Sequence, residues 1–180
     1  MNVILLFDRI KNKIFRLYRE YVFKKKTGYK IHLMENVRLI NTNLKIGKNV
    51  RLYPDVMFFG DGLIDIDDNV TIGNGTIIYA SKSGGVSIGA NTLVAAQCYI
   101  IDCNHGIQKD KLIREQMNDV EKVIIGEDCW LGTDVTVLKG SQIGNGAVIG
   151  AKAVVWGGSP IPDNAVAMGI PAVTTKYRES

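Results

Sequence analysis

Apolar residues recur at every sixth position through the last third of the chain. The members of this series are Ile125, Leu131, Val137, Ile143, Ile149, Val155, Ile161, Ala167 and Val173. The fifth residue of each hexad is small or medium in size, as at Cys129, Ala147 and Ala153. A helix repeats near 3.6 residues and a strand near 2, so a period of six indicates neither of them.

Six residues on each flat side and three sides in each turn would give a triangular β-solenoid. Successive coils should stack at roughly 4.8 Å, the spacing of paired parallel strands. The apolar first position of each hexad should point into the prism, with the small fifth position beside it. Glycine often follows the apolar residue, as at Gly126 and Gly132. We expect this glycine to turn the corner with a positive φ.

The same register is present, with interruptions, in the first two thirds of the chain. Its apolar positions are Met34, Ile40, Ile46, Leu52, Phe58 and Ile64, then, after a slip of two, Ile66, Ile72 and Ile78, and finally Ile88, Val94 and Ile100. A glycine-rich bulge lies at 81–85, and the register is lost between 100 and 125. We therefore predict an all-β solenoid domain over residues 30–175 with about seven coils. From Val173 a short polar tail should leave the coil, with 176–180 outside the domain.

The sixth position of each hexad should point outward, and many of these residues are apolar. Examples are Ile77, Leu93, Tyr99, Trp130, Val148 and Val154. A strand that is apolar on both faces needs both faces covered, and a monomeric prism would leave this outer stripe in water. The pattern favours an oligomer.

Residues 1–29 have the spacing of an amphipathic helix. Its apolar stripe consists of Val3, Phe7, Ile10, Ile14, Leu17 and Tyr21, and basic residues occupy the other faces. Two interpretations remain open. The helix either caps the solenoid or packs against a subunit, or residues 1–26 lie on an anionic membrane surface.

Charge is distributed unevenly along the chain. The net charge is +4, but residues 1–30 contain nine Lys and Arg against Asp8 and Glu20, which makes this segment +7 and the remainder −3. The body therefore does not have the basic surface of a nucleic-acid-binding protein. The apolar run at residues 3–7 is too short to span a bilayer and lacks the flanks of a secretion signal, so we expect a cytoplasmic protein.

The three cysteines do not form a CxxC pair, and their number is odd. Cys98 and Cys129 take the small fifth position of their hexads, so we interpret them as packing residues. An odd number of cysteines that serve as packing residues indicates a protein of a reducing compartment.

The break in the register contains the candidate chemistry. It starts with Asp102-Cys103-Asn104-His105-Gly106 and continues as a polar loop, 106–122. His105 takes an outward position, so its side chain should face a groove rather than the core. Long loops are usually functional or disordered, and this one could fold over the groove as a lid. A lone histidine in a polar loop is most often an ordinary surface residue.

The order Asn-His, loop, Trp130-Leu131-Gly132, followed by Gly150-Ala151 and the sequence Gly-Ile-Pro-Ala at 169–172, resembles the hexapeptide-repeat acyltransferases. Within them it resembles the sugar O-acetyltransferases of surface-polysaccharide synthesis, kin of the galactoside and maltose acetyltransferases. The resemblance covers about residues 30–175. It implies a left-handed parallel β-helix, a homotrimer, acetyl-CoA as acyl donor and a sugar acceptor. The spacing alone does not establish the handedness.

The resemblance also assigns roles to individual residues. His105 would be the catalytic base, because an imidazole with a pKa near 6.5 can take the proton of an attacking hydroxyl. Asp102 could orient its ring or merely share a face with it, and Asn104 could contact substrate or make a structural hydrogen bond. The expected contacts to coenzyme A are Thr133, Ala151, Trp156 and Lys176. The chain departs from the family where Trp156-Gly157 replaces Thr-Lys and where Val173 replaces a basic residue.

Other functions occur on the same kind of prism. A hydratase of the γ-carbonic-anhydrase kind uses the same prism but needs three histidine ligands per zinc, and the chain has only His32 and His105, so we expect no metal. An N-acetyltransferase acting on an amino sugar nucleotide and a non-catalytic β-solenoid scaffold stay open.

Overall fold

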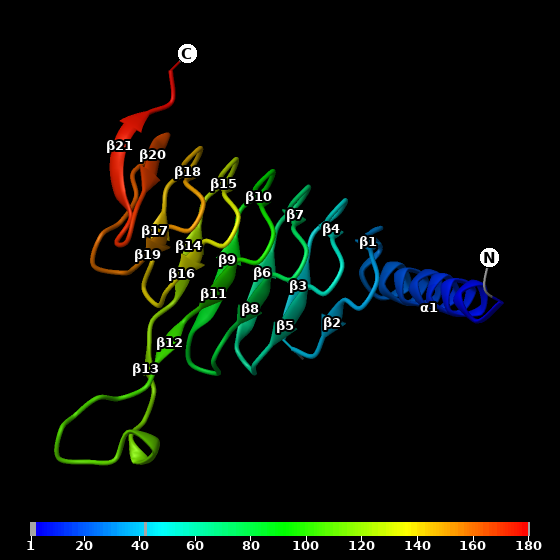
Figure 1. The fold of residues 1–180 in the computed structure, drawn as a ribbon, viewed down its shortest axis with the longest axis horizontal. Helices are drawn as coiled ribbons and strands as arrows, with labels where there is room; N and C mark the ends of the chain where they lie inside the picture. The colour runs from blue at the N-terminus through cyan, green and yellow to red at the C-terminus, as the bar shows by residue number, and fades with distance from the viewer. Residues whose placement is uncertain (1–2, 42, 180) are drawn as a thin grey trace.

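One α-helix and a stack of short parallel strands make up the fold (Figure 1). The structure is a computed structural model that describes residues 3–41 and 43–179, without the side chains of residues 3–5, 26 and 27. Residues 1 and 2 of the expected membrane-contact segment, the side chain of Val3 and the last residue of the expected tail lie outside this description.

The strands lie on three flat faces, named A, B and C in the order in which the chain visits them. Face A contains β1 (His32–Leu33), β4 (Arg51–Leu52), β7 (Thr71–Ile72), β10 (Leu93–Val94), β15 (Trp130–Leu131), β18 (Val148–Ile149) and β20 (Ala165–Met168). Face B contains β2 (Arg38–Leu39), β5 (Met57–Phe59), β8 (Ile77–Tyr79), β11 (Tyr99–Ile101), β16 (Thr136–Val137) and β19 (Val154–Val155). Face C contains β3 (Leu44–Ile46), β6 (Leu63–Ile66), β9 (Gly85–Ile88), β14 (Val123–Ile125) and β17 (Gln142–Ile143), followed by a bridge from Ile143 to Ile161.

Each strand on these faces pairs in parallel with the strand one coil further on. Leu33 is opposite Leu52 on face A, for example, and Ile46 is opposite Ile66 on face C. This arrangement confirms the β-solenoid predicted from the period of six. Figure 1 shows the coils stacked along one axis, with the helix at one end and the C-terminal strands at the other.

The core is a single column of side chains inside the prism. The inward positions of the regular hexads are almost completely buried: Ile125, Leu131, Val137, Ile143, Ile149 and Val155. Cys98 and Cys129 are buried between them as free thiols, which confirms their interpretation as packing residues. Phe58 is the largest of the fully buried side chains among the described residues.

The register predicted for the first coil was wrong by one residue. Met34 and Ile40 were expected inside, but Ile40 is 59% exposed, and Leu33 and the partly buried Leu39 point inward instead. The chain takes one residue more than a hexad between Leu39 and Ile46. Counting back from Ile46 in steps of six therefore misses both positions.

The corners turn at a different residue from the one predicted. We expected a positive φ at Gly126 and Gly132, but neither has one. The left-handed residue comes two positions later, at Asp128 and Asp134, with φ of 52° and 61°. Gly132 instead allows the close approach of two coils, because a Cβ there would lie 2.6 Å from the backbone nitrogen of Ala151.

Extra residues accumulate at the corner between faces B and C. The second coil has them at residues 60–62, where the predicted slip occurs, the third coil at 81–84, and the fourth coil at 102–122. Consecutive insertions are bonded to one another. The Asn41 side-chain nitrogen donates to the carbonyl oxygens of Gly60 and Gly62, at 2.8 and 2.9 Å.

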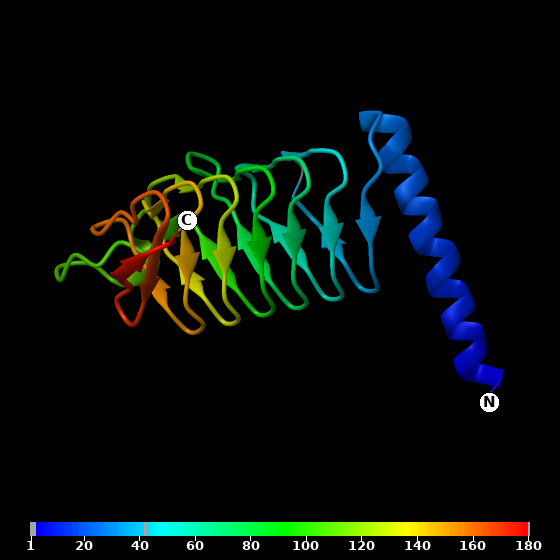
Figure 2. The ribbon, with the colours of Figure 1, turned by 90° about the horizontal axis from the view of Figure 1, so that it is seen from above.

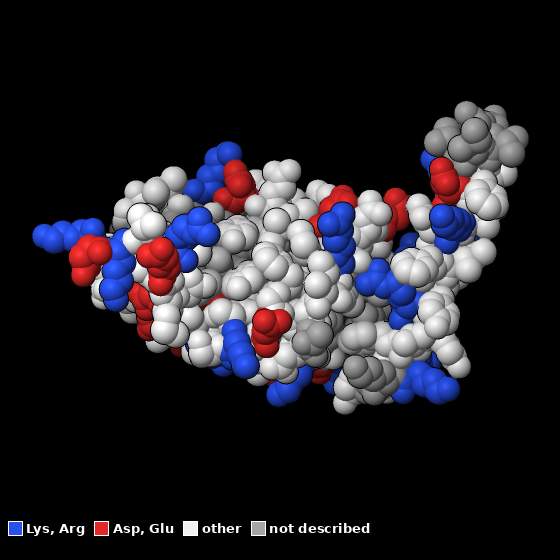
Figure 3. All heavy atoms as spheres, turned by 90° about the horizontal axis from the view of Figure 1, so that it is seen from below, with Lys and Arg blue, Asp and Glu red and all other residues white. Residues whose placement is uncertain are grey.

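The insertion of the fourth coil, named here the excursion (residues 102–122), contains the polar loop predicted at 106–122. It leaves through β12 (Cys103–Asn104), contains the short 3-10 helix η1 (Ile113–Glu115), and returns through β13 (Asp119–Val120), antiparallel to β12. It projects from the prism and is not folded back over it (Figure 1). Positive and negative side chains are intermingled at this end of the molecule (Figure 3).

The C-terminal segment differs from the predicted polar tail. Residues Val173–Tyr177 form β21, which turns back antiparallel to β20 at the end of face A. Val173 was expected inside the prism as the last member of the hexad series, but it is 55% exposed. The series ends at Ala167, because the chain reverses at 169–172 rather than starting another coil.

Helix α1 spans Val3–Thr27 and confirms the predicted amphipathic helix. Its C-terminal end contacts β1, and the rest projects away from the prism (Figure 2). Phe23 is its partly buried residue that packs against the core. Over the residues that the structure describes, α1 lacks the length of apolar sequence needed to cross a bilayer.

Candidate active site

His105 lies at the base of the excursion, directly after β12. Its side chain is exposed, and it makes no hydrogen bond with any described residue. Both ring nitrogens are thus free to meet a substrate, as a general base requires.

Asp102 does not make the contact to His105 that we considered. It is completely buried, and its carboxyl oxygens accept hydrogen bonds from the backbone nitrogen of Ser81 at 2.9 Å and from Ser81 Oγ at 2.9 Å. The two residues are three positions apart, and an odd spacing along an extended chain places side chains on opposite sides. Asp102 faces inward while His105 faces solvent.

The position of Asp102 suits an anchor for the excursion. Its carbonyl oxygen accepts a hydrogen bond from the backbone nitrogen of Glu121 at 2.9 Å, so it binds the returning strand as well as the bulge of the preceding coil. Gly84 of that bulge packs directly against the Asp102 carboxyl, where a Cβ would collide with it. The bulge at 81–84 and the excursion are therefore fitted to each other.

A groove of about 260 Å³ lies beside the base of the excursion. It is lined by Asn104, Glu121, Leu138, Lys139, Trp156, Gly157 and Gly158. Asn104 is exposed there, and its side chain makes no hydrogen bond with the described residues, so its amide is available to a substrate. Of the predicted site residues, the structure brings together Asn104 and Trp156, with His105 next in sequence.

Lys139 is a residue of this groove that sequence reasoning missed. Its ammonium group lies 2.8 Å from a carboxylate oxygen of Asp119 and 3.9 Å from one of Glu121, and its side chain is only 21% exposed. Lys139 thus joins the fifth coil to the returning strand of the excursion. Asp119 and Glu121 lie inside the register break, where no hexad pattern exists, so the sequence carries no signal of their contact with Lys139.

Trp156 forms one wall of the groove and is half exposed. Its ring lies against Gly158, where a Cβ would come within 2.5 Å of the ring. The missing side chain at Gly158 leaves room for this ring position. The exposed surface of the Trp156 ring is open to a flat ligand or to another subunit.

Thr133 and Ala151 lie at the corner between faces A and B, one above the other in consecutive coils. The backbone nitrogen of Lys152 donates to the carbonyl oxygen of Thr133 at 2.9 Å, and Thr133 Oγ1 donates to the carbonyl oxygen of Ala96 at 2.9 Å. Both residues are exposed. Trp156 follows β19 on face B and so lies at the other corner of that face.

Lys176 lies on β21, opposite Val166 of β20, and is exposed. Its ammonium group makes no ion pair with the described residues, whereas the neighbouring Arg178 is bound to Asp128 and to the carbonyl oxygen of Gly146 at 2.9 and 3.0 Å. Lys176 is thus the available cation of the two. A single chain does not bring Lys176, Thr133 and Trp156 into one pocket.

The thiols do not provide a nucleophile near the groove. Cys98, Cys103 and Cys129 are buried, and this burial raises the pKa of each thiol. A raised pKa keeps a thiol neutral and unreactive at neutral pH. No group of three His, Cys, Asp or Glu side chains among the described residues is arranged to hold a metal ion.

The repeat that builds these faces defines a class of protein. Residues 122–155 match the family described as bacterial transferase hexapeptide (six repeats).

Two Escherichia coli proteins extend the similarity beyond that segment. “Putative lipopolysaccharide biosynthesis O-acetyl transferase WbbJ” is 43% identical over 128 residues, which cover 66% of this chain and 63% of WbbJ. “Putative colanic acid biosynthesis acetyltransferase WcaF” is 33% identical over 134 residues, which cover 74% of this chain and 69% of WcaF. The chain belongs to the hexapeptide-repeat transferase family, and it spans about two thirds of the length of these two relatives.

Solved structures share the same fold. A single-residue mutant of AntD, an N-acyltransferase from Bacillus cereus, solved in complex with dTDP-4-amino-4,6-dideoxyglucose and coenzyme A, superposes with a TM-score of 0.71. The superposition covers 86% of this chain and 83% of AntD at 18% identity. At this identity the likeness concerns the fold alone.

Proposed function

We propose that this protein transfers an acetyl group from acetyl-CoA to a hydroxyl of a sugar or polysaccharide precursor, with His105 as the general base. The observation that carries the proposal is the exposed imidazole of His105, which makes no hydrogen bond with the described residues and directly follows the groove residue Asn104 in the sequence. The neutral, buried thiols support a direct transfer without an acyl-enzyme.

The reaction needs one proton acceptor and no enzyme nucleophile. A ring nitrogen of His105 takes the hydroxyl proton while the oxygen attacks the thioester carbonyl carbon. The carbon–sulfur bond then breaks, and the leaving thiolate recovers the proton from the imidazolium. We assign to Asn104, whose exposed side chain lines the groove, the binding of the acceptor or of the carbonyl oxygen.

The acyl donor fits the molecule best if two copies form the binding groove. The pantetheine contacts inferred for Thr133 and Ala151 lie at one corner of face B, while Trp156 lies at the other. A homotrimer would bring one corner of each prism against its neighbour and unite them. Leu93 and Trp130, outward on face A and each more than half exposed, support such an assembly.

A hydroxyl acceptor is favoured over an amine by the relatives. WbbJ, at 43% identity, is named as an O-acetyl transferase, whereas AntD, an N-acyltransferase, shares the fold at 18%. The proposed setting is the cytoplasm, where acetyl-CoA and sugar precursors meet. N-acetylation of an amino sugar nucleotide and a non-catalytic scaffold are the alternatives that the test must separate.

The test is release of free thiol from acetyl-CoA across a panel of sugars, nucleotide sugars and amino sugar nucleotides. His105→Ala should lower turnover on the best hydroxyl acceptor by about 10²- to 10⁴-fold, the usual contribution of a general base. Its thermal melting should stay unchanged, because the side chain is exposed. His32→Ala is the matched control and should retain turnover.

Three outcomes would count against the proposal. Retention of more than about a tenth of the activity in His105→Ala would remove the general-base assignment. A preference for amine acceptors would favour the N-acetyltransferase. Absence of both turnover and acetyl-CoA binding would favour the scaffold.

A further inference from the structure

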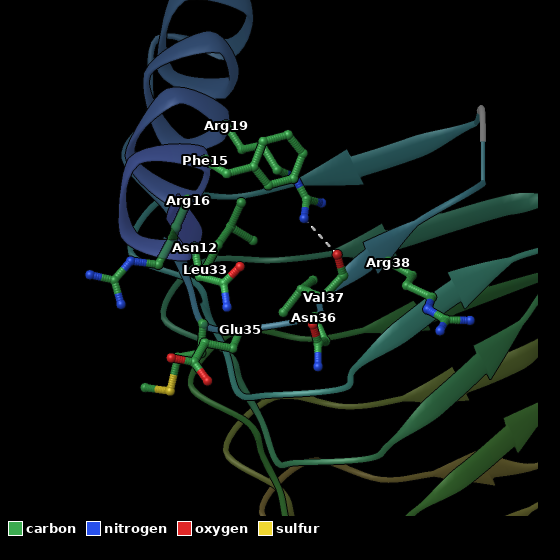
Figure 4. Close-up of a pocket in the computed structure, with 10 residues that line it drawn as sticks. Asn12, Phe15, Arg16, Arg19, Leu33, Glu35, Asn36, Val37 and Arg38 are labelled. Atoms are coloured by element: carbon green, nitrogen blue, oxygen red, sulfur yellow. Dashed lines mark hydrogen bonds between the residues drawn. The ribbon is translucent and has the colours of Figure 1, made fainter. Parts of the chain in front are cut away.

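Helix α1 docks onto the first coil through its polar face. Arg19 Nη1 donates to the carbonyl oxygen of Val37 at 2.6 Å (Figure 4), and Glu20 Oε1 accepts from the backbone nitrogen of Leu33 at 2.9 Å. Arg16 is half-buried on the same side, with Phe23 as the apolar contact. The coil therefore holds a side of the helix that consists mostly of charged residues.

The apolar side of the helix points the opposite way. Phe7 and Arg16, Ile10 and Arg19, and Ile14 and Phe23 are each nine residues apart, which is about half a turn around a helix of 3.6 residues per turn. An outer apolar face results, consisting of Phe7, Ile10, Ile14, Tyr18 and Tyr21. These side chains are between 49% and 68% exposed.

This orientation is the reverse of that of a capping helix. An amphipathic helix in a globular domain normally turns its apolar stripe to the core. Here the stripe lies outside and the polar face inside, so capping does not account for the apolar residues. The described residues of this chain leave the outer apolar face uncovered.

The charges around this face indicate what covers it. Lys11 lies within the apolar groove formed by Phe7, Ile10, Ile14, Phe15 and Tyr18, and Lys25 lies one turn beyond Tyr21 on the same side. Both are exposed. A second copy packed against this face would bring the lysines of both helices into one interface, where lysine is disfavoured. An anionic surface would pair with them.

We propose that the outer apolar face of α1 binds flat on an anionic lipid bilayer. The apolar side chains enter the boundary between headgroups and acyl chains, the two tyrosines lie at headgroup depth, and the lysines meet lipid phosphate. The polar face keeps its bonds to the first coil. The prism is thereby held at the membrane surface by a helix that does not cross it.

The test is co-sedimentation of the full chain with vesicles. Two compositions are compared, pure phosphatidylcholine and phosphatidylcholine with about 30% phosphatidylglycerol. The protein should bind the anionic vesicles and lose binding as salt is raised, with little binding to neutral ones. Lys11→Gln combined with Lys25→Gln should lower the binding by about tenfold or more.

A matched pair of variants separates the helix from other exposed apolar residues. Ile14→Glu should abolish most of the binding, whereas Ile113→Glu, at a similarly exposed isoleucine in η1, should leave it unchanged. Both variants should melt like the parent protein. The proposal is overturned if the protein binds neither vesicle or both equally. It is also overturned if Ile14→Glu lowers the oligomer mass by light scattering while vesicle binding persists, since a second copy then covers the face.

Discussion

Replacing Asp102 should unfold the base of the excursion without touching the imidazole directly. In the parent protein the backbone nitrogen and the hydroxyl of Ser81 both donate to the Asp102 carboxyl at 2.9 Å, and Asp102 is completely buried. Asp102→Ala leaves both donors without an acceptor. A buried donor left without a partner costs about 1–3 kcal/mol. Two such donors give an expected loss of about 2–6 kcal/mol.

Ser81→Ala is the milder change. It removes one bond from the Asp102 carboxyl and leaves the bond from the Ser81 backbone nitrogen, so the expected loss is about 1–2 kcal/mol. The two substitutions share a contact. The double variant should therefore lose less than the sum of the single variants, with a coupling of about 0.5–3 kcal/mol.

Urea unfolding gives the stability of each variant, and thiol release gives its turnover. Turnover should fall in Asp102→Ala, because the strand that positions His105 loses its anchor. The acidic limb of the pH–rate profile of Asp102→Ala should have the same midpoint as that of the parent protein, since no bond joins the side chains of Asp102 and His105. A displaced limb would mean that Asp102 acts on the imidazole itself, and unchanged stability would refute the anchoring role.

Two further predictions concern the core and the assembly. Burial raises the pKa of Cys98 and Cys129 above that of a free thiol, so the folded chain keeps these protons after the unfolded chain has lost them. The stability that the neutral thiols provide should therefore decline as the pH rises through the alkaline range, and urea unfolding at about pH 8 and about pH 10 should show a smaller decline in Cys129→Ala than in the parent protein. Trp130→Lys, on the outward side of face A, should convert the proposed trimer into monomers by light scattering with an unchanged circular dichroism spectrum, and an unchanged trimer mass would remove face A from the proposed interface.

The sequence predicted the prism well because the period of six reflects its geometry directly. Every coil must return to the same three directions, so inward residues such as Leu131 and Ile149 repeat wherever the corners have equal length. The prediction failed where a corner is longer. Met34 and Ile40 were misplaced for that reason, and Val173 because the chain reverses before it.

The site was less predictable, because its contacts cross the break in the register. The pattern placed His105 outside the prism, and the structure has it exposed. Asp102 bonds to Ser81, and Lys139 bonds to Asp119, in each case about one coil away along the chain. The number of residues between the partners depends on the lengths of the insertions at 81–84 and 102–122, which the hexad pattern does not predict. Likewise, the apolar stripe of α1 predicted a helix but not which side of it meets the first coil.

The insertions at the corner between faces B and C bear on how such a solenoid can change in evolution. Each coil of the prism contacts only the coils before and after it, so a longer corner disturbs its neighbours and leaves the distant coils as they were. Loop closure becomes only slightly less favourable as a loop lengthens. Selection can therefore act on the excursion almost independently of the coils that hold Thr133, Ala151 and Trp156. Under the proposed function, descendants of one ancestor would differ in the excursion while inheriting the same proposed contacts to acetyl-CoA.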